Sequence, residues 1–254
     1  MFRCVFILIW LTSLPVRAES AADQLTGTGI AEFTAAYQAW DGGRFAAASE
    51  RLRQASTNAS ATVTNFYWLG ASEFHRMLQL RGNATNTSAA DAALESAIAA
   101  LTAAVKLDEN HAECQALLGT LYGMKINGNL LRAAWFGPRV AKHQSGALKT
   151  GAGNPRVQYL LGMCQFHTAK KPAAWQEALT TLLGAEKLFE VEAKTAAAPL
   201  DPRWGYDSCL TFIGHTYELL GQRKAAGEYF SRALAMHPAD HLAREGLKRV
   251  LANK

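Results

Sequence analysis

The sequence contains few charged residues, few cysteines and none of the short motifs that mark common enzyme active sites. Lys, Arg, Asp and Glu make up 19% of the 254 residues, and the 26 basic and 21 acidic side chains form no run of like charge. This pattern argues against a nucleic-acid partner. The chain also lacks the nucleophile-elbow, zinc-protease, phosphate-loop and dinucleotide-binding motifs. The sequence therefore predicts no catalytic residue and no cofactor.

Long hydrophobic runs are absent after the first residues of the chain. An apolar run over 4–14 follows Arg3 and precedes Pro15 and a small-x-small site at 16–18. This arrangement is typical of a cleaved signal peptide over residues 1–18, so we expect the mature protein to be periplasmic or secreted. A retained membrane anchor is the alternative, although the run is short for a span. No later stretch holds 18 consecutive apolar residues, so we expect no stable membrane insertion after cleavage.

Three cysteines remain after the predicted cleavage, namely Cys114, Cys164 and Cys209. An odd number allows at most one disulfide within the chain, and three are too few for a disulfide scaffold. Each lies in an apolar helical pattern, where a cysteine packs as a small hydrophobic side chain. The sequence leaves open whether two of them are bridged.

Regular spacing of small and large residues is the strongest signal in the sequence. Hydrophobic residues make up 49% of the chain, enough for a sizeable core. Residues 207–240 match the pattern W-x2-L-G-x2-Y…A-x3-F…P at every spacing, with Leu210, Ile213, Gly214, Tyr217, Gly221, Ala226, Phe230, Ala233 and Pro238. Pairs of small residues are also 15 positions apart at three places, namely Ala55 and Gly70, Ala104 and Gly119, and Ala147 and Gly162.

Residues 207–240 closely resemble a tetratricopeptide repeat, and the resemblance extends over most of the mature chain. It implies an all-α fold, a right-handed superhelical α-solenoid of about five helical hairpins, because each hairpin must bury its apolar face against its neighbours. The third repeat is the poorest match, since Gly128 and Gly137 interrupt it. The implied order is a short linker over 19–28, repeats over about 29–62, 63–111, 112–154, 155–206 and 207–240, and a capping helix over 241–252.

The resemblance also implies a binding face, because proteins of this family usually bind partners in the groove formed by the first helix of each pair. Aromatic side chains anchor such interfaces, since they bury a large area at a small entropic cost. The same rings can instead pack beneath the extended turns of the repeats, and the sequence does not decide between these roles. The candidate groove residues are Phe33, Tyr37, Trp40, Tyr67, Phe74, His75, Tyr159, Met163, Phe166, His167 and His215.

We expect a non-enzymatic adaptor or scaffold of the bacterial cell envelope that binds a segment of a protein partner along this groove. A polysaccharide-binding or export accessory protein is the alternative, because stacked aromatic rings also suit sugars. A third hypothesis is an enzyme or metal site that uses Cys164 and His167, with His215 from the next repeat. The sequence does not identify the partner, the pathway or the oligomeric state.

Overall fold

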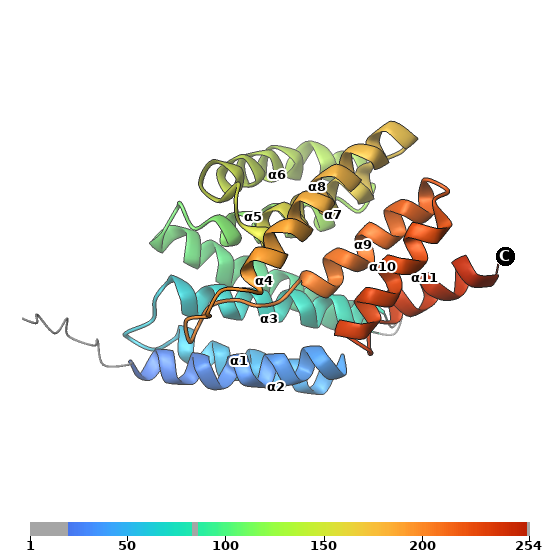
Figure 1. The fold of residues 1–254 in the computed structure, drawn as a ribbon. Coiled ribbons are helices and arrows are strands. Elements are labelled where there is room, and N and C mark those ends of the chain that lie inside the picture. The colour runs from blue at the N-terminus through green and yellow to red at the C-terminus, as the bar shows by residue number, and fades with distance from the viewer. Residues whose placement is uncertain (1–19, 83–85, 253–254) are drawn as a thin grey trace, which may run out of the picture.

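A computed structural model describes residues 20–82 and 86–252, so the predicted signal peptide over 1–18 lies outside the described residues. The described part of the chain forms eleven helices and no strand (Figure 1). They are arranged as five consecutive helical hairpins followed by one terminal helix. The expected all-α solenoid of about five hairpins is therefore confirmed.

Each hairpin consists of two helices joined by a turn. The first contains α1 (Ala21–Ala39) and α2 (Gly42–Ser56), and the second contains α3 (Val63–Arg81) and α4 (Thr87–Leu107). The first helices contact one another in order, so that they form one layer of the stack. The remaining helices are α5 (Ala112–Ile126), α6 (Leu130–Gly151), α7 (Pro155–Thr168), α8 (Pro172–Glu192), α9 (Tyr206–Leu219), α10 (Arg223–Met236) and α11 (His241–Ala252).

The predicted linker over 19–28 is corrected by the structure, because most of it is the beginning of α1. Ser20 caps this helix, and its hydroxyl accepts a hydrogen bond from the Asp23 backbone nitrogen at 3.1 Å. The side chain of Asn65 in α3 donates to the Thr26 hydroxyl at 2.8 Å. The first turns of α1 are thus held by a cap and by contact with the second hairpin, neither of which is visible in the repeat pattern.

Glycines allow the two helices of a hairpin to approach closely. A Cβ atom added at Gly162 in α7 would lie 2.7 Å from the Leu182 side chain in α8, and one at Gly214 in α9 would lie 2.7 Å from the Phe230 ring in α10. Both distances are too short for real carbon atoms, so the small residue of the repeat is required by the large residue opposite.

One helix in the described ranges, α4, is long and apolar enough to cross a membrane by length and composition alone. Helices in protein cores pass the same test. In this structure Leu94, Ala97 and Leu101 of α4 are buried and belong to the main hydrophobic core.

The solenoid closes on itself, because its fifth hairpin returns to its first. Residues 193–205 run from α8 across α3 to the start of α9 (Figure 1, orange). The Trp68 indole nitrogen in α3 donates to the Leu200 carbonyl at 2.9 Å. At the end of this segment, the Tyr37 hydroxyl of α1 contacts the Ser208 hydroxyl of α9 at 2.9 Å. The face formed by the first helices is therefore covered by the chain itself.

Candidate functional site

The structure places most of the predicted groove residues inside the molecule. Trp40, Phe166 and His215 are half-buried, and only His167 is exposed. The expectation that the whole set lines an open groove is therefore corrected. The seven buried residues, each 6% exposed or less, are Phe33, Tyr37, Tyr67, Phe74, His75, Tyr159 and Met163.

These residues are buried because rings from distant parts of the chain pack against one another. The His75 ring lies 5.2 Å from the Phe33 ring and 4.9 Å from the ring of Trp204, which belongs to the covering segment 193–205. The Trp204 indole nitrogen also donates to the Tyr67 hydroxyl at 2.9 Å. The aromatic residues of the first helices thus bind the chain's own covering segment.

A buried polar cluster joins the first hairpin to the fifth. The Tyr37 hydroxyl lies 2.9 Å from both oxygens of Asp207, and the His237 Nδ1 lies 2.9 Å from one of them. Burial lowers the pKa of His237, but the hydrogen bond and charge of Asp207 outweigh this effect and raise the pKa above its usual value. The Tyr37 and His237 rings also stack at 4.9 Å. This cluster holds the closed form of the solenoid together.

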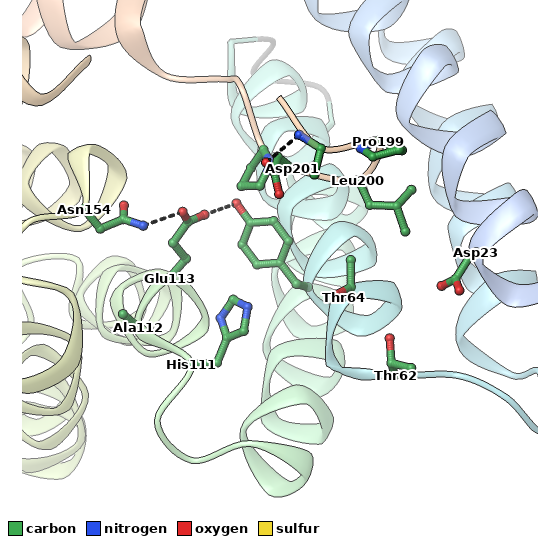
Figure 2. A pocket seen from close by; sticks show the side chains of 13 residues that line it. Asp23, Thr62, Thr64, His111, Ala112, Glu113, Asn154, Pro199, Leu200 and Asp201 are labelled. Carbon is green, nitrogen blue, oxygen red and sulfur yellow. Dashed lines mark hydrogen bonds between the residues drawn. The ribbon is translucent and has the colours of Figure 1, made fainter. Parts of the chain in front are cut away.

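An open cleft of about 900 Å³ remains between the first helices and the covering segment (Figure 2). It lies where α3, α5 and α7 begin. The N-cap residues of these helices, Thr62, His111 and Asn154, line it. We call it the acidic cleft, and its lining residues are Asp23, Thr62, Thr64, Tyr67, His111, Ala112, Glu113, Asn154 and residues 198–202.

A hydrogen-bonded carboxylate forms the floor of the acidic cleft. Glu113 is 5% exposed and accepts hydrogen bonds from Asn154 Nδ2 at 2.7 Å, from Arg156 Nε at 2.8 Å and from the Tyr67 hydroxyl. Figure 2 shows the Asn154 side chain pointing toward Glu113. Arg156 also donates two hydrogen bonds to Glu192, at 2.9 and 2.5 Å. Because one guanidinium serves two carboxylates, the network carries a net negative charge.

The electrostatic character of the cleft follows from its lining. Asp23 and Asp201 add two more carboxylates, and the lining residues described include no Lys or Arg. Asp201 also accepts a hydrogen bond from the Ala198 backbone nitrogen at 2.8 Å, which shapes the covering segment. Burial, followed by the charge of Glu113, raises the pKa of Tyr67, so this hydroxyl stays protonated as a donor.

The third hypothesis, chemistry at Cys164 and His167, lacks the required geometry. Burial raises the pKa of the Cys164 thiol, whereas a nucleophilic cysteine needs a lowered pKa. Its sulfur lies 3.7 Å from the Thr120 hydroxyl. In the ranges that the structure describes, no three His, Cys, Asp or Glu side chains are placed to hold a metal ion. Cys114, Cys164 and Cys209 are free thiols.

Sequence reasoning missed the acidic cleft, although one signal pointed to it. Glu113 and Arg156 occupy the second position of the third and fourth predicted repeats, and this position faces the inner layer in the repeat family. Opposite charges at equivalent positions of neighbouring repeats predict an ion pair across the stack. The covering segment gave no such signal, because it lies in an insertion outside the repeat pattern.

Comparison with known proteins agrees with this architecture. Residues 208–240 match the model of the tetratricopeptide repeat family. No curated protein sequence matches the chain. Among solved structures, TTC0263, a thermophilic tetratricopeptide repeat protein of Thermus thermophilus, superposes with a TM-score of 0.64 at 14% identity, covering 91% of this chain and all of that one.

Two further structures share the fold. The HusA haemophore from Porphyromonas gingivalis has a TM-score of 0.63 at 16% identity, covering 80% of this chain and 96% of that one. A chain of the Cut9–Hcn1 hetero-tetramer of APC/C has a TM-score of 0.63 at 16% identity, covering 91% of this chain and 36% of that one. Residues 208–240 thus match one tetratricopeptide repeat, and the chain as a whole shares the fold of a solved tetratricopeptide repeat protein.

Proposed function

We propose that the protein is a non-enzymatic scaffold of the bacterial cell envelope that binds a segment of a protein partner in the acidic cleft. The fold commonly mediates protein–protein interactions and generally does so without catalysis. The observation that carries the proposal is the position of the cleft. It is an opening on the first-helix layer, bounded by Thr64 and Tyr67 of α3 and Glu113 of α5.

The lining of the cleft favours a positively charged segment. Its three carboxylates belong to Asp23, Glu113 and Asp201, of which Glu113 is already bound by Arg156, and the described lining residues include no Lys or Arg. Pro199 and Leu200 add an apolar wall beside them. The volume of about 900 Å³ is in the range of ligand pockets and accommodates a few peptide residues. A Lys or Arg side chain flanked by apolar residues matches this arrangement.

The polysaccharide alternative loses the observation on which it depended. It required stacked aromatic rings on an open face, but Phe33, Tyr67, Phe74 and Tyr159 are buried. The enzyme hypothesis is weakened in the same way by the raised pKa of Cys164.

The envelope location rests on the amino-terminal sequence alone. Its test is cell fractionation combined with mass spectrometry of the mature amino terminus. A mature chain that begins near residue 19 in the periplasmic fraction or the medium agrees with the proposal. An intact amino terminus in the cytoplasm contradicts it.

The binding test compares variants that carry the same change in net charge. The variant Asp23→Asn/Asp201→Asn removes two cleft carboxylates but keeps amide oxygens at both positions, including the acceptor for Ala198. The control Asp91→Asn/Glu177→Gln removes two exposed carboxylates outside the cleft. Each protein is crosslinked in the envelope fraction and purified, and the recovered partners are quantified by mass spectrometry.

We expect the wild type and the control to recover the same partner. Recovery of the partner by the cleft variant should fall about tenfold. This corresponds to a loss of about 1.4 kcal/mol of binding free energy when two carboxylates at the rim are removed. Equal recovery by all three proteins would place the binding surface elsewhere.

A further inference from the structure

The middle of the chain carries charge of one sign only. Residues 114–176 contain eight Lys and Arg residues and no Asp or Glu, although the whole chain is nearly balanced. This asymmetry becomes informative when it is combined with the surface of α6.

The amino-terminal half of α6 exposes apolar side chains to solvent. Leu130, Leu131 and Trp135 are 86%, 83% and 65% exposed. Ala134 and Pro138 are exposed as well, so the outward stripe of this half-helix is apolar. A surface helix normally presents polar residues to solvent, whereas this half of α6 presents apolar ones.

The opposite side of α6 packs against its hairpin partner. The Phe136 and His143 rings stack on Tyr122 of α5 at 5.9 and 5.6 Å. Among the described helices, α6 contacts only α5 and α7. Its contact with α7 is near its carboxyl end, where Gly151 lies against Val157. The amino-terminal half is therefore packed on α5 alone, and α6 lies at the edge of the stack in Figure 1.

Basic side chains flank the apolar stripe. Arg132, Arg139 and Lys142 lie within the same three turns, and none of them forms an ion pair in the part of the chain that the structure describes. The Arg139 guanidinium lies 5.0 Å from the centre of the Trp135 ring and donates to the Trp135 carbonyl at 2.7 Å. One of the three cations, Arg139, thus lies against the exposed indole.

We propose that residues 130–142 of α6, the α6 patch, bind the surface of a bilayer that contains anionic lipids. Leu130, Leu131 and Trp135 enter the boundary between headgroups and acyl chains, while Arg132, Arg139 and Lys142 bind lipid phosphates. Protruding Leu and Trp side chains with basic neighbours are the composition of interfacial helices. Because only one face of the helix is apolar, it lies on the membrane and does not span it.

A bilayer surface fits the α6 patch better than a partner protein does. The apolar side chains of the patch are exposed rather than lining a hollow, and its three cations, Arg132, Arg139 and Lys142, form no ion pair in the described part of the chain. An anionic surface satisfies both features, since it accepts a protruding apolar ridge and attracts every nearby cation. This inference does not depend on the acidic cleft, which uses different helices and the opposite charge.

The test measures sedimentation of the purified full protein with vesicles of phosphatidylcholine alone or with about one-third phosphatidylglycerol. One variant is Leu130→Ser/Leu131→Ser/Trp135→Ser, and another is Arg132→Gln/Arg139→Gln/Lys142→Gln. The matched controls change exposed residues outside the patch. They are Leu107→Ser/Val191→Ser/Leu251→Ser and Lys106→Gln/Lys187→Gln/Lys224→Gln.

We expect the wild type and both controls to bind the anionic vesicles at least tenfold more tightly than the neutral ones. Both patch variants should lose at least tenfold of that binding, while far-ultraviolet circular dichroism and Tm remain close to the wild type. All variants share the same amino-terminal segment, so its contribution is equal. The proposal is overturned if the wild type does not bind vesicles, or if the patch variants bind as the wild type does. Loss of a protein partner from the patch variants without any vesicle binding assigns the α6 patch to a protein instead.

Discussion

Protonation of His75 is expected to destabilise the fold in mild acid. The His75 side chain is 3% exposed, and its ring lies 5.2 Å from Phe33, 5.0 Å from Phe74 and 4.9 Å from Trp204. Its Nδ1 donates to the Ala71 carbonyl at 2.8 Å. Burial lowers the pKa of His75 to about 4, so the ring is neutral in the folded protein at pH 7.

The direction of the effect follows from proton linkage. In the unfolded chain His75 binds a proton near its usual pKa of 6.5, whereas in the folded protein it does so near 4. Between these values the unfolded state holds more protons, so the free energy of unfolding falls as the pH decreases. Between pH 7 and pH 5, protonation of His75 alone is expected to lower the free energy of unfolding by about 2 kcal/mol.

The assay is urea unfolding followed by circular dichroism at pH 7, 6 and 5, for the wild type and His75→Gln. The variant is expected to be less stable at pH 7, because Gln fills less of the aromatic site. Wild-type stability should nevertheless decline with acid by about 2 kcal/mol more than that of the variant. The control His167→Gln changes an exposed histidine, so its stability should fall with acid nearly as much as that of the wild type. Equal declines in the wild type and His75→Gln would refute the reasoning.

Three further predictions concern the closure, the ion network and the hairpin contacts. Because the pKa of His237 is raised by Asp207, its stabilising effect is present below pH 6.5 and is lost at higher pH; urea unfolding between pH 6.5 and 8.5 should show a decline that His237→Gln lacks. Arg156→Met leaves the buried Glu113 and the partly exposed Glu192 without their ion-pair partner and should lower the free energy of unfolding by about 3–5 kcal/mol, and an unchanged urea midpoint would contradict the network. Gly162→Ala should lower the free energy of unfolding by about 1–3 kcal/mol through overpacking, whereas Gly184→Ala, whose added Cβ meets nothing within 4 Å, should be neutral or stabilising, as measured by urea unfolding of both variants.

The acidic cleft and the α6 patch use different helices and carry opposite charge, although α5, which contributes Glu113 to the cleft, is the hairpin partner of α6. If both proposals hold, the protein rests on an anionic membrane surface through α6 while Asp23 and Asp201 hold a basic segment of a partner. The cleft variant Asp23→Asn/Asp201→Asn can therefore be combined with either α6 patch variant, and each set of substitutions is expected to impair only its own binding.

The fold class was determined by the sequence itself, because the information lies in short-range patterns. Gly162 and Gly214 each occur at a position where one helix crosses its hairpin partner, and large residues occur opposite them. Such contacts repeat from one hairpin to the next, so a pattern of spacings along the chain predicts them. The one-sign charge of residues 114–176 is likewise readable without a structure.

Which surfaces are open was decided only by the tertiary structure. Tyr37 and Asp207 are 170 positions apart, and their contact closes the stack. Trp204 lies in an insertion with no repeat pattern, yet it contacts His75 and Tyr67 and covers the expected aromatic groove. A repeat pattern specifies contacts between neighbouring units, whereas burial depends on every segment that reaches a side chain in space. The sequence alone therefore determined the helical hairpins, and long-range packing decided that the aromatic face is core and that the acidic cleft remains open.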